Sequence, residues 1–209
     1  TLAFVFTSIE HDRKSISSML DKEGIAIFGL TTVGEFTEEG IESGSIAILL
    51  LDMDPDHFTI AIKDHRDGSA IESGRYIGNF GLSAYSQPAF IISGSNIDTP
   101  GELIMRGLLE VIDETTKVIG GMAGDDRLLG NCVFTNQQES NQGVLALIVD
   151  EDKITLAGEA VSGWKAVGTE KTITKCEGPW IYSIDDQPAM QVVKKFTGID
   201  IQESKSDGA

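Results

Sequence analysis

The sequence predicts an α/β fold with mixed β-sheets and flanking helices, built by internal duplication of one unit. Short apolar runs typical of strands alternate with helical patterns, and a glycine turn follows the second strand of each unit. Residues 1–65 are similar in pattern to residues 88–163. Each half is expected to contain a strand, a helix, a strand, a glycine turn and a hairpin. Parallel crossovers and antiparallel hairpins together give mixed sheets, and we expect the halves to pack as pseudo-symmetric partners.

Each half opens with a strand and a helix. The strand at 3–6 resembles 89–92, so we align Ala3 with Ala89. The first helix is predicted over 10–22, with Gly24 as its stop. Its predicted buried face consists of Ile16, Met19 and Leu20.

The second helix has clear start signals. Thr99 is the predicted N-cap, Pro100 occupies the first helical position and Glu102 completes a capping box. The buried stripe is expected to consist of Ile104, Leu108, Val111 and Ile112.

Glycine turns follow at 29–35 and 120–126, and each leads to a predicted hairpin. The hairpins cover 44–62 and 143–160, and the second half inserts a short strand at 132–135.

Two further segments lie outside the repeat. Residues 63–87 are rich in Gly and Ser and predict a connector with one weak strand at 75–80. After residue 163 the pattern changes, and 164–184 alternates like one or two strands. Pro188 is predicted to open a short helix before Gly198, with inward side chains at Met190, Val193 and Phe196. The polar tail at 202–209 predicts disorder.

Composition and charge exclude several classes of protein. The net charge of −17 and the pI near 4.4 argue against binding nucleic acid or an anionic membrane surface. The longest aliphatic run, 46–51, is far shorter than the roughly 20 residues of a membrane helix. No basic leader precedes the first strand, and Cys132 with Cys176 is too sparse for a disulfide framework or a zinc site. We therefore expect a soluble, cytoplasmic protein.

The second glycine turn is the strongest candidate for a binding site. Glycines permit a close approach of backbone N–H groups to a ligand, although a tight turn with capping carboxylates has the same pattern. The turn lacks the Lys-Ser/Thr end of a phosphate loop and the spacing of a dinucleotide fingerprint. The loop N–H groups would bind a ligand carboxylate. Glu35, Asp125 or Asp126 would bind a ligand ammonium group, so the site would suit a small zwitterion. The candidate ligand-binding residues are Gly120, Gly121, Met122, Gly124, Asp125, Asp126, Gly34, Glu35 and Trp164.

Catalysis has little support from the sequence. His11, His57 and His65 are not spaced as metal ligands, and no serine lies in a Gly-x-Ser-x-Gly elbow. The adjacent acids Asp125 and Asp126 would point to opposite faces of an extended segment, which hinders general acid-base work on one atom. We expect neither a hydrolase nor a redox enzyme, and no metal.

Five segments together resemble the N-terminal domain of FIST proteins. They are Gly-Gly-Met-Ala-Gly-Asp-Asp at 120–126, Val-Phe-Thr-Asn at 133–136, Gly-Val-Leu-Ala-Leu at 143–147, Gly-Trp-Lys-Ala-Val-Gly at 163–168 and Ile-Asp-Asp-Gln-Pro-Ala at 184–189. The resemblance implies a prokaryotic sensory domain that binds small ligands such as amino acids. It also implies a signalling partner such as a histidine kinase, a chemotaxis receptor or a cyclic-nucleotide enzyme.

Two alternatives stay open beside this interpretation. Some FIST proteins are haem-containing nitric oxide sensors, so haem is a possible cofactor, and a protein-interaction scaffold without ligand is the other alternative. The family usually carries a C-terminal domain. Residues 164–201 are then expected to be a junction to a domain that this chain lacks, after a duplicated domain at 1–163.

Overall fold

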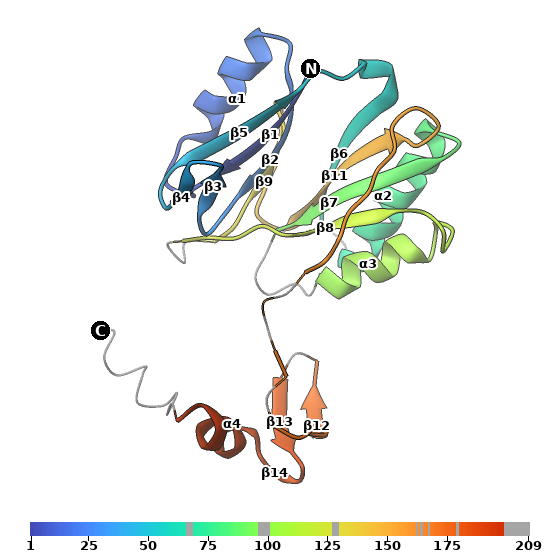
Figure 1. Ribbon diagram of the computed structural model, residues 1–209. Helices are drawn as coiled ribbons and strands as arrows, with labels where there is room; N and C mark the ends of the chain where they lie inside the picture. Colours follow the sequence, from blue (N-terminus) through green and yellow to red (C-terminus); the bar gives the residue numbers. More distant parts are fainter. Residues whose placement is uncertain are drawn as a thin grey trace. The chain divides into compact units, whose positions relative to one another are not determined.

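The chain forms two compact units, Thr1–Glu159 and Ala160–Ala209, which we describe separately (Figure 1). The computed structural model describes residues 1–65, 69–95, 101–126, 130–161, 163, 165–166, 168–178 and 180–198. It confirms the mixed α/β class, with parallel and antiparallel pairs in both large sheets of the first unit.

The first large sheet has the strand order β10-β9-β2-β1-β5. Its strands are β1 (Leu2–Thr7), β2 (Ala26–Thr31), β5 (Ile46–Leu51), β9 (Val133–Phe134) and β10 (Glu139–Ser140). β1 runs parallel to β2 and antiparallel to β5, and β9 confirms the strand predicted at 132–135. A separate hairpin of β3 (Glu35–Thr37) and β4 (Gly40–Glu42) lies between β2 and β5 in the chain.

The second large sheet has the order β6-β11-β7-β8. Its strands are β6 (Phe58–Asp64), β7 (Pro88–Gly94), β8 (Val118–Met122) and β11 (Gly143–Asp150). β7 is parallel to β8, whereas β11 is antiparallel to both β7 and β6. β11 is the central apolar strand, and its first seven residues are buried.

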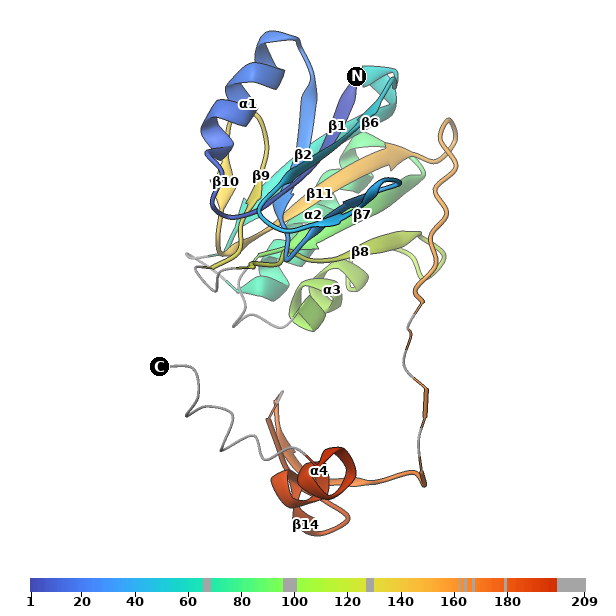
Figure 2. The ribbon, with the colours of Figure 1, turned by 60° about the vertical axis from the view of Figure 1, so that its left-hand side comes forward.

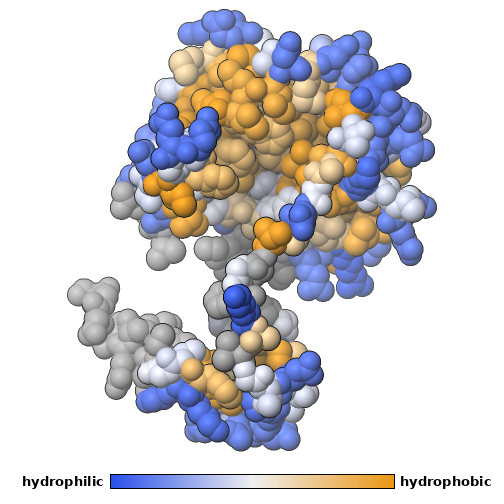
Figure 3. Space-filling model, in the orientation of Figure 1, coloured by the Kyte–Doolittle hydropathy of each residue, from blue (hydrophilic) through white to orange (hydrophobic). Residues whose placement is uncertain are grey.

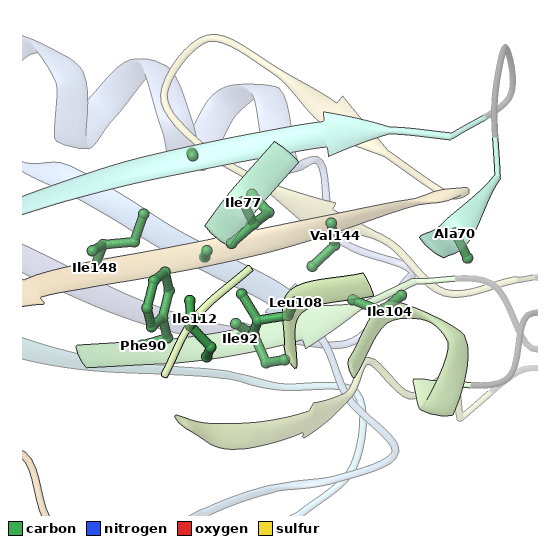
Figure 4. Packing of buried hydrophobic residues seen from close by; sticks show 11 residues of the cluster. Ala70, Ile77, Phe90, Ile92, Ile104, Leu108, Ile112, Val144 and Ile148 are labelled. Atoms are coloured by element: carbon green, nitrogen blue, oxygen red, sulfur yellow. The ribbon is translucent and has the colours of Figure 1, made fainter. Parts of the chain in front are cut away.

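The two sheets face each other and helices cover their outer faces (Figures 1 and 2). α1 (Arg13–Lys22) packs Ile16 and Leu20 against the first sheet, while Met19 is 61% exposed, so its predicted burial was wrong. α3 (Gly101–Leu109) packs on the second sheet through Ile104 and Leu108, as Figure 4 shows. The predicted caps Thr99 and Pro100 lie outside the described residues.

The predicted connector at 63–87 was wrong, because it contains a helix, α2 (Ala70–Ala84). Ser69 and Glu72 form a capping box, in which each side chain accepts a backbone N–H of the other residue. The glycines permit close helix packing instead of a loop. A Cβ on Gly74 would lie 2.1 Å from the Ile104 carbonyl oxygen of α3. The glycines that suggested a connector therefore reflect close packing of α2, at Gly74 against α3 and at Gly81 against Phe90 of β7.

The strand pairings of the two halves correspond, shifted by one residue from the alignment made on sequence. The N–H of Ser8 donates to the Ser45 carbonyl, and the N–H of Ser95 donates to Gly143 in the same place of the second sheet. Side chains alternate along a strand, and Ala3 faces the helix-covered side as Phe90 does. Ala3 therefore corresponds to Phe90, not to Ala89.

Neither predicted hairpin forms. β5 pairs with β1 in the first sheet, whereas β6 pairs with β11 in the second, so the turn at η1 (Pro55–His57) carries the chain from one sheet to the other. After β11, residues 155–160 have no regular secondary structure. The sequence pattern predicted strands but did not specify their neighbours.

The second unit contains a small sheet and one helix. β12 (Ile173–Glu177) pairs with β13 (Trp180–Ile184), which pairs with β14 (Gln187–Pro188). α4 (Ala189–Thr197) ends at Gly198 in the left-handed conformation, as predicted. Its buried residues are Ala189 and Val192, so the predicted inward placement of Met190 and Phe196 was wrong. The predicted disordered tail lies outside the described residues.

Candidate functional site

The two glycine loops contact each other where the parallel strands end. The Gly124 N–H donates to the Thr31 carbonyl oxygen at 2.8 Å, and a Cβ on Gly124 would lie 3.1 Å from the Val33 nitrogen. The Ala123 N–H donates to Gly94 at 2.8 Å, which joins the loop to the end of β7 as well. This edge combines the carboxyl ends of β1, β2 and β7, the position at which α/β sheets commonly bind ligands.

Glu35 is a buried carboxylate at this edge, with 4% of its surface exposed. Its Oε1 accepts the Thr32 hydroxyl at 2.5 Å, and its Oε2 accepts the Ser45 hydroxyl at 2.8 Å and the Ser45 N–H at 3.1 Å. Glu35 therefore ties the first glycine loop to the residue before β5. A carboxylate can accept about four hydrogen bonds, so this group retains acceptor capacity.

Asp126 comes from the second loop and joins the same network. Both of its carboxylate oxygens accept the Ser8 hydroxyl, at 3.0 and 3.1 Å. The Ser8 N–H in turn donates to the Ser45 carbonyl at 3.1 Å. A continuous hydrogen-bonded path therefore runs from Asp126 through Ser8 and Ser45 to Glu35.

Asp125 serves a different segment from Asp126. Its Oδ2 accepts the Gly130 N–H at 2.6 Å, and the residue is 8% exposed. The two adjacent carboxylates thus act on separate partners, Gly130 and Ser8. The arrangement provides no pair of acids directed at one substrate atom.

Gly120, Gly121 and Met122 do not belong to this loop, because they continue β8 alongside β7. A Cβ on Gly120 would lie 1.9 Å from the Ile92 carbonyl oxygen, which explains the glycine by the close approach of two strands. These three residues line a separate hollow of about 280 Å³ beside α3. The predicted site is therefore divided between two places.

A larger groove, of about 670 Å³, lies next to the Glu35 carboxylate. Its walls come from the end of β1, the first glycine loop, the β3–β4 hairpin and β5. The lining residues are Phe6, Thr32, Gly34, Glu35, Phe36, Thr37, Glu38, Ala47, Ile48 and Leu49. Only Gly34 and Glu35 were predicted. The apolar run at 46–51 was the sequence signal that could have indicated Ala47, Ile48 and Leu49.

The groove does not fit haem. An axial ligand to haem iron is usually His, Cys, Met or Tyr, and none of these residue types lines the groove. His11 instead contacts the Gly44 carbonyl oxygen at 3.0 Å through Nε2. His65 is buried directly after β6, and desolvation lowers its pKa. Among the described residues, no group of three or more His, Cys, Asp or Glu is placed to hold a metal ion.

The buried Cys132 adds no reactive thiolate to this edge. Burial raises the pKa of the Cys132 thiol to about 11, so the thiolate is scarce at neutral pH, and Cys176 lies exposed in the second unit. Trp164 lies outside the described residues. No described helix combines the length and the apolar character needed to cross a membrane.

Comparison with known proteins identifies the family. No curated protein matches the chain. The FIST N domain, in contrast, matches residues 1–187, which include both large sheets and the two glycine loops that meet at their edge. With residues 1–187 of 209 matched, the chain belongs to the FIST family.

Proposed function

We propose that this chain is a sensory domain that binds a small amphipathic amine, of the amino-acid class, in the groove beside Glu35, and passes the signal to a partner protein. The FIST family is a family of sensory domains rather than of enzymes. The observation that carries the proposal is the junction of the two glycine loops, which brings the Glu35 and Asp126 carboxylates into one hydrogen-bonded network.

The groove and the network suit the two ends of such a ligand. Phe6, Phe36 and Leu49 offer apolar surface to a side chain, and Glu35 lies in the wall. An ammonium group would find an acidic end held by neutral hydroxyls of Thr32, Ser45 and Ser8, with hydrogen-bond capacity to spare. The chain's strong negative charge favours cationic groups over anionic ones at a distance.

A thermal-shift titration tests the proposal. The panel contains leucine and phenylalanine, isoamylamine, which lacks the carboxylate, and 4-methylpentanoate, which lacks the amine. Saturation by leucine or phenylalanine at about 100 times its Kd stabilises the fold by about 2.7 kcal/mol. For a chain of this size that corresponds to a rise of about 5–10 °C in the melting temperature. The amine should retain a shift and the carboxylate should not.

Asp126→Asn and Asp56→Asn form the matched pair of variants. Asp126 belongs to the network, whereas Asp56 is an exposed residue of η1. We expect Asp126→Asn to weaken binding about tenfold or more, because it removes one of the two negative charges of the Glu35–Asp126 network, and Asp56→Asn to leave binding unchanged. A folded protein that responds to no amine, or equal binding by both variants, would contradict the proposal.

A further inference from the structure

The outer edge of β5 is open in the first unit. β5 ends its sheet, and the strand pairs of the described residues place nothing beyond it. Its counterpart in the second sheet, β11, has an occupied edge, because β6 runs antiparallel along it from Gly143 opposite Asp64 to Val149 opposite Phe58. In the part of the chain that the structure describes, this strand position is thus filled in the second sheet and unfilled in the first.

The open edge carries apolar side chains on both faces. Ile46 and Ile48 are 41% exposed, and Leu49 and Leu50 are 54% exposed. Figure 3 shows apolar residues gathered on the visible face of the first unit, over β5 and the neighbouring strands. β5 contains no charged residue and no proline, and its pairing with β1 has an unbroken register. Proteins usually protect a free edge with such residues or with bulges, so an unprotected edge indicates a pairing surface.

Among the described residues of the first unit, none fills this position. Residues 155–160, which follow β11 as β6 follows β5, form no strand. Gly158 instead lies against Ile119 of β8, where a Cβ would approach the Ile119 side chain to 2.6 Å. The segment that the duplication would assign to the β5 edge is therefore placed elsewhere.

We infer that a second copy of this chain occupies the edge, with the two β5 strands paired antiparallel about a two-fold axis. A two-fold axis perpendicular to the sheet makes identical edge strands antiparallel. That is the direction in which β6 meets β11, so the paired sheet would repeat the arrangement that the molecule already contains. Backbone hydrogen bonds supply the affinity and the apolar side chains fill both faces.

The charges flanking β5 favour the antiparallel arrangement. Asp52 and Asp54 follow the strand, whereas Ser43, Gly44 and Ser45 precede it. Antiparallel pairing sets the acidic end of one copy against the neutral residues of the other, and a parallel pair would place the acidic ends together. Between two molecules that each carry a net charge of −17, an uncharged strand is a surface with little direct repulsion.

The neighbouring β3–β4 hairpin enlarges the apolar surface. Ile41 of β4 is 80% exposed and lies outside the groove proposed for the ligand, whereas Phe36 and Leu49 belong to the wall of that groove. A stable interface buries about 800 Å² on each partner, more than one edge strand alone provides. The hairpin, whose β3 contacts β5, offers additional apolar contact area through Ile41.

Sedimentation equilibrium of the whole chain tests the inference, with Leu50→Lys and Leu109→Lys as matched variants. Both leucines are 54% exposed, but Leu50 lies on β5 and Leu109 at the end of α3. We expect a dimer for the unmodified chain and for Leu109→Lys. Leu50→Lys should raise the dimer Kd about tenfold or more, because it introduces two like charges at the paired edge.

Leu50→Thr is a second variant in case the lysine variant fails to fold, which circular dichroism and thermal melting would reveal. Threonine keeps the β-propensity and removes apolar area, so the dimer should weaken without a change in fold. A chain that stays monomeric at hundreds of micromolar would overturn the inference. So would a dimer that both Leu50 variants leave intact, or open-ended assemblies in place of a closed pair.

Discussion

β5 and β11 have similar sequences and occupy corresponding positions, yet their burial differs. β5 reads Ile-Ala-Ile-Leu-Leu-Leu and β11 reads Gly-Val-Leu-Ala-Leu-Ile-Val-Asp. β11 has a strand on each side and helices α2 and α3 over one face, and its first seven residues are buried. β5 has one neighbour, and none of its residues is fully buried. Burial of an apolar strand in this fold therefore depends on its neighbours more than on its composition.

The largest expected effect comes from replacing a leucine by alanine at one position of β5 and at the equivalent position of β11. Leu49 lies opposite Phe4 of β1, and Leu147 lies opposite Ile91 of β7. Leu147 is 1% exposed and Leu49 is 54% exposed. Leu147→Ala should cost about 2–5 kcal/mol of unfolding free energy, whereas Leu49→Ala should cost less than about 1 kcal/mol.

Urea denaturation at low protein concentration, where pairing between molecules does not contribute, measures both values. Equal costs for the two substitutions would mean that β5 is as well covered as β11. That result would contradict the difference in burial between the two strands.

A smaller effect is expected at the far edge of the second sheet, on β8. Gly120 has a φ of 151°, and a Cβ there would meet the Ile92 carbonyl oxygen, whereas a Cβ on Gly121 would meet nothing within 4 Å. Gly120→Ala should cost about 1–3 kcal/mol through backbone strain and separation of β8 from β7. Gly121→Ala should change the unfolding free energy by less than about 0.5 kcal/mol. Chemical denaturation distinguishes the two variants. An unchanged unfolding free energy in Gly120→Ala would show that β7 and β8 do not approach closely enough at Ile92 to exclude a Cβ.

The smallest effect concerns His65, which follows β6 at the occupied edge of β11. Its backbone N–H donates to the Gln142 carbonyl at 2.9 Å. Desolvation lowers the pKa of the His65 imidazole in the folded state, and the negative charge of Asp64 partly opposes this shift. The unfolded chain then binds a proton more readily. Stability is therefore complete above about pH 6.5, and it falls as the pH drops below that value toward the folded pKa.

His65→Gln should remove this component of the pH dependence. The slope for one proton is at most about 1.4 kcal/mol per pH unit, so the difference between the two proteins is modest. Unfolding free energies at pH 7.5 and 5.5 give the comparison. An identical pH dependence in the variant would show that His65 is solvated in the folded protein.

Much of the fold could be predicted from local patterns. β1, β2, β7, β8 and α1 follow from apolar periodicity, and Gly24 and Gly198 end their helices as expected. α2 was missed because Gly74, Gly78 and Gly81 read as a loop, although the Ser69–Glu72 capping box marks its start. The hairpins were wrong because alternation within a strand contains no information about which sheet it joins.

The candidate site, like the fold, could be predicted only in part. The repeated glycine loops predicted that Gly34, Glu35, Gly124 and Asp126 are near one edge, and the structure places them there. Phe6 and Leu49 could not be assigned to the groove from sequence, because their exposure depends on the empty position beside β5. Whether any of these residues binds a ligand stays a prediction.

Backbone hydrogen exchange of β5 and β11 shows directly whether β5 has an open edge that a second copy covers, because each amide reports on its own edge. In an antiparallel strand, alternate amides point to the two sides, so half of the β5 amides face the open edge in a single molecule. We expect the β11 amides to stay protected at every protein concentration. The outward amides of β5 should exchange rapidly in dilute protein and become protected as the concentration rises. Protection of those amides that is the same at all concentrations, or that never appears, would contradict it.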